Sequence, residues 1–281
     1  MTAPLAAPAM QRSHGAGALA VNTSAGATRI DRLHQSGNAK IRVPKTYGAA
    51  LEAVLINTSG GITGGDTLDW TLHAGPGTQA VVTTQACERI YKSTGDTGRQ
   101  TTTATVEAGA SLFWLPQETI LFDGGRLHRE LQVDLARDAR FIGLESLVFG
   151  REAMGETVAR GFFRDRWRIR REGHLVHADD LRFDLADPAD IEAPAILGTN
   201  RVVATLVAIL PDDAESLDLT VAACRTRLAG TSGGVSRVGT GAGAKIVVRI
   251  AAPSSYVLRR QLLPVIALFL GDRSLPKVWS L

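Results

Sequence analysis

The chain is short of cysteine, net charge, aromatic residues and long apolar runs, and each shortage excludes a class of protein. Two cysteines in 281 residues cannot build a disulfide framework, and they fit a reducing compartment such as the cytoplasm. A formal net charge of +3 is too small for the field of a nucleic-acid or membrane-surface protein. Aromatic residues make up 5% and do not interleave with the arginines, which disfavours RNA binding. The longest apolar run near the C-terminus, 262–270, is far below the roughly 20 residues of a membrane-spanning helix.

Recognisable catalytic and ligand-binding motifs are missing as well. The sequence has no phosphate-binding G-x-x-x-x-G-K-[ST] or G-x-G-x-x-G, no G-x-S-x-G nucleophile elbow, no H-E-x-x-H and no C-x-x-C. His174 and His177 lie three apart in a strand-like segment, so their side chains should point to opposite faces and not chelate one metal. Cys87 has no histidine nearby in sequence and is predicted to be a structural thiol. We therefore expect no catalytic residue, no stable metal site and no tightly bound cofactor.

Strand signals dominate what is present. Leu68, Trp70 and Leu72 alternate with polar residues, the two-residue period of a half-buried strand. Residues 100–106 are nearly all threonine and valine, which suit a pleated surface. Turn residues recur roughly every ten to fifteen positions, a spacing that favours an all-β sandwich, barrel or layered β-structure.

Helix signals are few and lie late in the chain. Ser254 or Ser255 is an N-cap for a helix over 256–270, and Gly271 is its stop. Pro264 should kink this helix or split it in two. A second helix is predicted over 216–230, although part of that segment reads equally well as a strand.

A loose N-terminal arm followed by a single domain is expected. Residues 1–35 are rich in alanine, glycine, serine and threonine without a clear period, which predicts a loose N-terminal arm. Residues 36–281 then form a single β-rich domain.

One loop is unusually rich in glycine. The segment 57–66, NTSGGITGGD, follows an apolar strand and contains two glycine pairs. A phosphate cradle is one interpretation, but a tight double turn between strands is favoured because glycine marks turns. The positions that define this loop are Asn57, Gly60, Gly61, Gly64 and Gly65.

Four longer strings occur together in a characteristic order. They are INTSGGITGGD (56–66), TTQACERIYKS (83–93), WLPQETILFDGGRL (114–127) and ESLVFGREAMGE (145–156). In order and spacing the chain closely resembles the urease accessory protein UreD (UreH) family, from about Lys40 to the terminal KVWSL. It departs at Cys87, where the family more usually has a small residue such as alanine.

The resemblance implies a mainly β, layered or helical-type β-sheet structure with about two α-helices toward the C-terminal half. It also implies a non-catalytic chaperone of the cytoplasm that works with the helical partner UreF and the GTPase UreG. Together they bind apo-urease and help install its nickel ions, which UreE brings to the GTPase. Members are thought to carry a polar internal passage, so that nickel would be in transit and not a resident cofactor.

Spaced oxygen ligands suit such a passage, because an ion must enter and also leave, and a strong soft-ligand site would trap nickel. Isolated acids lie within the four strings, and Arg126 is a further plausible partner for them. Structural salt bridges and turn caps are the equal alternative. The candidate passage residues are Asp66, Thr84, Gln85, Glu118, Asp123, Glu145, Arg151 and Glu156.

The C-terminal helix and tail are a candidate partner interface, because exposed apolar ends often mark docking surfaces. The residues chosen are Tyr256, Arg259, Arg260, Leu263 and Trp279.

Two other functions stay open at this point. A β-sandwich hydrolase could use Glu118 and Asp123 as an acid/base pair, in an open cleft with the carboxyl groups about 5–10 Å apart. A protein-binding β-module without metal traffic is the other alternative.

Overall fold

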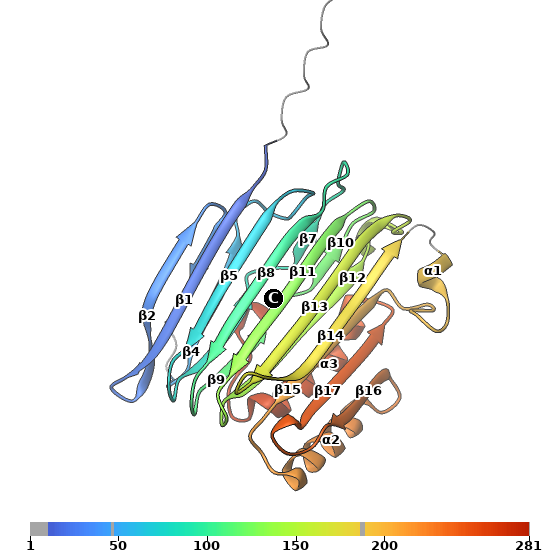
Figure 1. The fold of residues 1–281 in the computed structure, drawn as a ribbon. Coiled ribbons are helices and arrows are strands. Elements are labelled where there is room, and N and C mark those ends of the chain that lie inside the picture. Colours follow the sequence, from blue (N-terminus) through green and yellow to red (C-terminus); the bar gives the residue numbers. More distant parts are fainter. Residues whose placement is uncertain (1–10, 46–47, 186–188, 281) are drawn as a thin grey trace, which may run out of the picture.

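Two β-sheets and a pair of helices form three layers in the computed structural model, which describes residues 11–45, 48–185 and 189–280 (Figure 1). The first sheet, sheet A, has seven strands in the order β14-β13-β11-β8-β5-β1-β2. Their bounds are β1 His14–Ser24, β2 Ala27–Ser36, β5 Thr67–Ala74, β8 Gly98–Val106, β11 Arg126–Leu135, β13 Gly161–Arg171 and β14 His174–Leu185.

The second sheet, sheet B, follows the order β16-β17-β15-β12-β9-β6-β4-β3, with β10 beside β12 and β7 beside β10. Its first strands are β3 Ala39–Arg42, β4 Leu51–Asn57, β6 Gln79–Thr84, β7 Glu88–Ile90, β9 Ser111–Leu115 and β10 Thr119–Leu121. Its later strands are β12 Arg140–Phe149, β15 Val202–Ile209, β16 Ser232–Val238 and β17 Lys245–Ala252.

The helices are α1 Ala189–Glu192, α2 Ala214–Leu228 and α3 Ser255–Leu270, with short 3₁₀ turns at Glu152–Met154, Gly241–Gly243 and Lys277–Ser280. In the part of the chain that the structure describes, no helix has the length and apolarity needed to cross a membrane.

From β4 to β13 the chain passes back and forth between the two sheets. Strands β5, β8, β11 and β13 pair in parallel in sheet A, and β4, β6, β9 and β12 pair in parallel in sheet B. Each full turn of this path, called a coil below, therefore adds one strand to each sheet. The predicted mainly β, layered and helical-type architecture is confirmed.

The core lies between the sheets, where side chains from both inner faces meet. In β5, Leu68, Trp70 and Leu72 are all buried, as their alternation predicts. Strand β12 is buried at nearly every position, because sheet A covers one of its faces and the helical layer packs on the other face of sheet B.

The C-terminal helix matches its prediction closely. The Ser254 hydroxyl accepts a hydrogen bond from the Val257 amide at 3.2 Å, and Gly271 adopts a left-handed φ of 61° at the end. Helix α3 remains one element across Pro264, so the helix is not split. Buried Leu262 and Val265 flank the proline and hold this stretch in the core.

The ambiguous segment near residue 220 is a helix and not a strand. Asp213 caps α2 by accepting a hydrogen bond from the Ser216 amide at 2.8 Å. The buried positions of α2 recur at helical spacing: Leu217, Val221, Cys224 and Leu228.

The prediction of a loose arm over residues 1–35 is wrong for residues 14–35, which form β1 and most of β2 in sheet A. Residues 1–10 lie outside the described part. The buried positions of β1 include Gly15 and Gly17, so its alternation carries little hydrophobic signal. A Cβ at Gly17 would lie 2.3 Å from the Trp70 ring, which shows that the glycine makes room for this indole.

Candidate functional site

A cavity of about 210 Å³ with a partly polar lining lies between the two sheets, where residues of β4, β6, β8, β11 and β12 face it. Three candidate passage residues line it, namely Thr84, Gln85 and Glu145. Cys87, Glu88 and Arg129 also contribute to its wall. The sequence-based candidates are therefore brought together only in part.

At the inner end of the cavity, one arginine is held between two carboxylates. Arg129 of β11 contacts Glu145 of β12 at 2.5 Å (Nη1–Oε2) and Asp165 of β13 at 2.7 Å (Nη2–Oδ2). All three side chains are more than nine-tenths buried. The Trp114 indole donates a hydrogen bond to Glu145 Oε1 at 2.9 Å, and Arg129 donates one to the Thr119 hydroxyl at 2.9 Å. These contacts join sheet A to sheet B.

The pKa of the Glu145 carboxyl is raised above its ordinary value. Burial is the largest cause, and the neighbouring Asp165 charge acts in the same direction. Arg129 and the Trp114 hydrogen bond act in the opposite direction. Burial therefore favours the protonated form of Glu145, and the Arg129 charge opposes this.

A second, smaller cavity of about 20 Å³ adjoins this cluster. Arg129 and Glu145 line both cavities, and Asp165, Asp179 and Thr205 are the other polar residues of the smaller one, whose walls are otherwise apolar. The ion cluster thus borders on both cavities.

Glu88 adds a second carboxyl with a raised pKa to the larger cavity. Burial raises its pKa to about 7, although Asn57 Nδ2 donates a hydrogen bond to Glu88 Oε1 at 3.0 Å and lowers the pKa. Asn57 belongs to the glycine-rich loop, so this loop supports one wall of the cavity.

The glycine-rich loop is the turn between β4 and β5. Gly60 and Gly65 have left-handed φ values of 79° and 86°. At Gly61 a Cβ would lie 2.3 Å from the Tyr91 ring, and at Gly64 it would lie 2.3 Å from the Asp96 carbonyl oxygen. The glycines therefore permit close packing of two loops, as expected of a tight turn.

Two of the predicted passage acids are turn caps. Asp66 accepts hydrogen bonds from the amides of Ser13 (2.8 Å) and Thr63 (2.9 Å). Asp123 accepts two bonds of 2.9 Å from the amides of Ala159 and Arg160. Both residues therefore match the alternative interpretation, in which these acids are structural turn caps. Neither residue lines either of the two cavities.

Arg151 and Glu156 form a separate ion pair on an exposed loop. The guanidinium contacts the carboxylate at 2.8 and 2.9 Å, and this pairing lowers the pKa of Glu156. Arg151 also lies over the Phe122 ring at 4.6 Å. The predicted partner Arg126 lies over the Phe162 ring and not beside a predicted acid.

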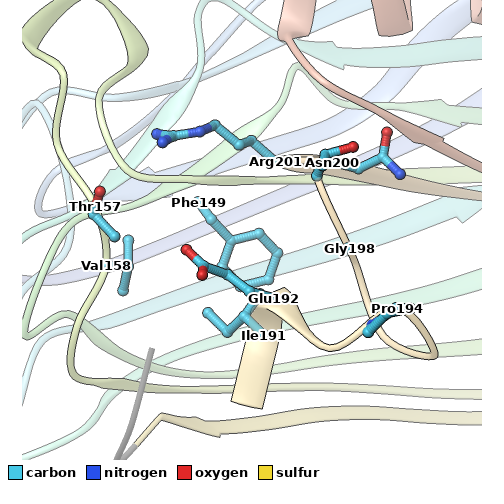
Figure 2. A pocket seen from close by; sticks show the side chains of 10 residues that line it. Phe149, Thr157, Val158, Ile191, Glu192, Pro194, Gly198, Asn200 and Arg201 are labelled. Atoms are coloured by element: carbon cyan, nitrogen blue, oxygen red, sulfur yellow. The ribbon is translucent and has the colours of Figure 1, made fainter. Parts of the chain in front are cut away.

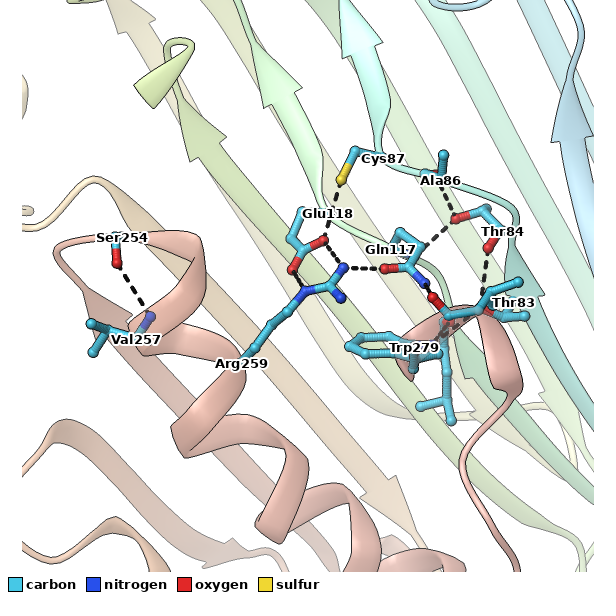
Figure 3. Close-up of polar contacts among 12 residues, drawn as sticks. Thr83, Thr84, Ala86, Cys87, Gln117, Glu118, Ser254, Val257, Arg259 and Trp279 are labelled. Carbon is cyan, nitrogen blue, oxygen red and sulfur yellow. Dashed lines mark hydrogen bonds and ion pairs between the residues drawn. The ribbon is translucent and has the colours of Figure 1, made fainter. Parts of the chain in front are cut away.

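Glu118 is bound to the C-terminal helix (Figure 3). Arg259 of α3 donates hydrogen bonds of 2.7 and 2.8 Å to its two carboxylate oxygens and another to Gln117. The Cys87 thiol donates to Glu118 Oε2 at 3.4 Å. Burial and the carboxylate raise the pKa of this thiol to about 12, so Cys87 is held in its unreactive form.

These contacts do not build the paired-carboxylate site of a hydrolase. Glu118 is ion-paired and buried, whereas Asp123 caps a turn. Neither carboxylate is free to act as an acid or a base in the described structure.

The predicted C-terminal interface is divided between core and surface. Trp279 is buried and donates to Thr83 Oγ1 and to the Leu115 carbonyl, both at 3.2 Å. Arg259 is engaged with Glu118, as above. Tyr256 and Arg260 are exposed, and Leu263 is half-buried.

A larger hollow of about 450 Å³ lies at another edge, between the end of β12 and the segment around α1 (Figure 2). Phe149, Val158, Ile191 and Pro194 give it apolar walls, and Glu192 is its carboxylate. Arg201 also lines it, so the hollow holds one carboxylate and one guanidinium and not the two carboxylates on one arginine of the ion cluster.

The two histidines near residue 175 behave as predicted for a strand. His174 is exposed and His177 is buried, so they do not share a site. Among the described residues, no group of three or more histidine, cysteine, aspartate or glutamate side chains could hold a metal.

Sequence reasoning missed three residues of the site. Arg129 and Asp165 occupy inward positions of strands whose other inward residues are mostly apolar, such as Leu131 and Trp167. The sequence signal for both residues is a charged side chain at a position where the alternation of the strand predicts a buried one. Glu88 lies in a short strand with no such pattern.

Comparison with known proteins adds an independent result. The family model described as UreD urease accessory protein matches residues 13–280. A urease accessory protein UreD of Chelativorans sp. (strain BNC1) is 50% identical over 277 residues, which is 98% of this chain and 97% of the relative. One of Rhizobium etli is 47% identical over 281 residues, which covers 100% of both chains. One of Brucella suis is 45% identical over 272 residues, covering 97% of this chain and 96% of the relative.

These matches extend over the strands that build the cavity and over the helices that cover sheet B. They agree with the four sequence strings and with the fold. The chain belongs to the UreD urease accessory protein family, which supports a role in urease maturation.

Proposed function

We propose that this chain is a non-catalytic scaffold that guides nickel into apo-urease along a polar passage between sheets A and B. The observation that carries the proposal is the pair of adjoining cavities that share Arg129 and Glu145 in their linings. A cation moving between the sheets would meet carboxylates at Glu88, Glu145 and Asp165 in turn.

The chemistry of this lining suits transit. Carboxylate, amide and hydroxyl oxygens are spaced along the cavity, and Cys87 is held as a thiol and not as a metal-binding thiolate. Separated oxygen ligands bind a first-row cation less tightly than clustered thiolates and imidazoles do. The ion can therefore be accepted and passed on.

We assign the GTP-dependent step to the GTPase UreG, which acts with UreF, and the delivery of nickel to UreE, which takes part indirectly. All of these proteins would act in the cytoplasm. The exposed Tyr256 and Arg260 on α3 are the part of the predicted interface that remains available to a helical partner. Loss of UreF co-purification on Tyr256→Ala, with unchanged thermal stability, would support this assignment. Unchanged co-purification would remove it.

The passage is tested by loading urease with nickel in cells that lack the native chain. Glu145→Gln removes one carboxylate charge from the passage, and Glu172→Gln makes the same change at an exposed turn. We expect Glu145→Gln to lower the nickel content and activity of urease severalfold while the complex still forms, and Glu172→Gln to match the wild type. Full nickel loading by a folded Glu145→Gln variant would refute the passage.

A further inference from the structure

The ion cluster contains two carboxylates and one cation. Glu145 comes from sheet B and Asp165 from sheet A, and the Arg129 guanidinium lies between them at 2.5 and 2.7 Å. When both acids are ionised, the cluster is one positive charge short of neutrality. Uncompensated charge in a buried place is costly, and either a proton on Glu145 or a cation of higher charge would relieve it.

Oxygen atoms suited to such a cation are already in place. Asp165 Oδ1 is buried and has no hydrogen-bond partner among the described residues. Asp165 also lines the smaller cavity, where a ligand could approach it. The Thr119 hydroxyl lies 2.9 Å from the guanidinium, so a third oxygen faces the same point.

We propose that Glu145, Asp165 and Thr119 form a transient site for a divalent first-row cation, and that the Arg129 guanidinium occupies this site in the resting protein. The metal binds only when the guanidinium moves aside, for which the adjacent larger cavity has room. This inference rests on the proposed passage and names its central site.

Competition by Arg129 has a functional consequence. A buried pair of carboxylates without a competitor would hold a divalent ion and release it slowly. The guanidinium returns to the carboxylates as the metal leaves, so the empty site is never left with two unpaired charges. Arg129 is thus a positioning residue that limits how tightly the ion is held.

Metal binding to the isolated full-length chain tests this without urease. Nickel titration by calorimetry should show at least tenfold tighter binding to Arg129→Gln than to the wild type, with Arg129→Lys close to the wild type. The gain should disappear in Arg129→Gln/Glu145→Gln. Equal affinity in a folded Arg129→Gln, or a gain that survives the double substitution, would overturn the proposal.

Because Arg129→Gln could fail to fold, the wild-type chain provides a second measurement. Nickel is paramagnetic, and the Trp114 indole N–H is bonded to Glu145, whereas Trp279 lies under α3. Millimolar nickel should broaden the Trp114 indole resonance before that of Trp279, and Glu145→Gln should abolish the difference. Equal broadening of the two resonances contradicts the site.

The two proposals fail in different ways. Nickel binding at Glu145 without any effect of Glu145→Gln on urease loading would retain the metal site and reject the passage. Impaired loading without nickel binding at the cluster would retain the passage and reject the site.

Discussion

Arg259 of helix α3 donates hydrogen bonds from Nε and Nη2 to the two carboxylate oxygens of Glu118, a residue 141 positions earlier in the chain. Glu118 is only 2% exposed. Although burial acts to raise the pKa of this carboxyl, the hydrogen bonds and charge of Arg259 hold it below its usual value. A buried charge pair therefore ties the helical layer to the segment between β9 and β10, whose Gln117 lines the larger cavity.

Replacing Arg259 with methionine should destabilise the protein by about 2–4 kcal/mol, because it leaves the Glu118 carboxylate buried without its partner. Urea unfolding measures the change. Arg260→Met is the matched control, since Arg260 is exposed and contacts only the Tyr256 ring in the described structure, and it should shift stability by less than about 0.5 kcal/mol. Equal effects of the two substitutions would show that the Glu118 pair is energetically unimportant.

Cys87 should resist alkylation. With its pKa raised to about 12, less than about one molecule in a thousand carries a thiolate at pH 8, and only the thiolate reacts. Iodoacetamide labelling followed by peptide mass spectrometry should be at least about a hundredfold slower at Cys87 than for a free cysteine. Glu118→Gln removes the nearby negative charge and should speed the reaction. Labelling of the wild type at the free-cysteine rate would contradict the hydrogen bond to Glu118.

His177 should make stability fall in mild acid. Burial, followed by the charge of Lys245, lowers its pKa to about 4, and the nearby Arg249 and Arg168 act in the same direction against Asp179. Between about pH 6.5 and pH 4 the unfolded chain binds the proton and the folded chain does not, so the free energy of unfolding decreases as pH falls.

The loss assigned to His177 is up to about 3 kcal/mol. His177→Phe can keep the edge contact with Trp167 and removes the titrating group. Urea unfolding across this pH range should show a shallower decline for the variant. Parallel curves for the two proteins would mean that folding does not lower the pKa of His177.

Gly17→Ala should destabilise sheet A by about 1–3 kcal/mol, because the new methyl group meets the buried Trp70 ring at 2.3 Å. Thermal unfolding measures the change. Gly234→Ala is the control, since a Cβ there has no atom within 4 Å in the described structure. A neutral Gly17→Ala would mean that Trp70 can repack at no cost.

How far the sequence predicts the fold depends on where its signals are periodic. Leu68, Trp70 and Leu72 show the two-residue period of β5 directly, and Ser254 and Gly271 mark the ends of α3. The sequence does not predict strand β1, because two of its buried positions are glycine. One of these glycines makes room for an indole from another strand. Tertiary packing of that kind leaves no local pattern.

The site shows the same division. Glu145 stands out in sequence as an acid within an apolar run, but its partners Arg129 and Asp165 come from other strands of the coil. Asp66 has the same appearance in sequence, yet its carboxylate caps two amides. Trp279 looks like an exposed tail residue, and only the packing of α3 against sheet B places it in the core. The residue types therefore identify candidate residues, and the path of the chain through the two sheets determines which of them come into contact.

The back-and-forth path of the strands bears on synthesis. Every residue of the ion cluster, from Trp114 to Asp165, lies within one continuous stretch that leaves the ribosome before α2 and α3 are made. Domains fold progressively as they emerge, so the charged centre can assemble early. Until residues 214–270 follow, however, the outer surface of β9 and β12 has no helical cover. A nascent chain that stalls near residue 210 would therefore be complete at its centre and prone to aggregate from its uncovered side.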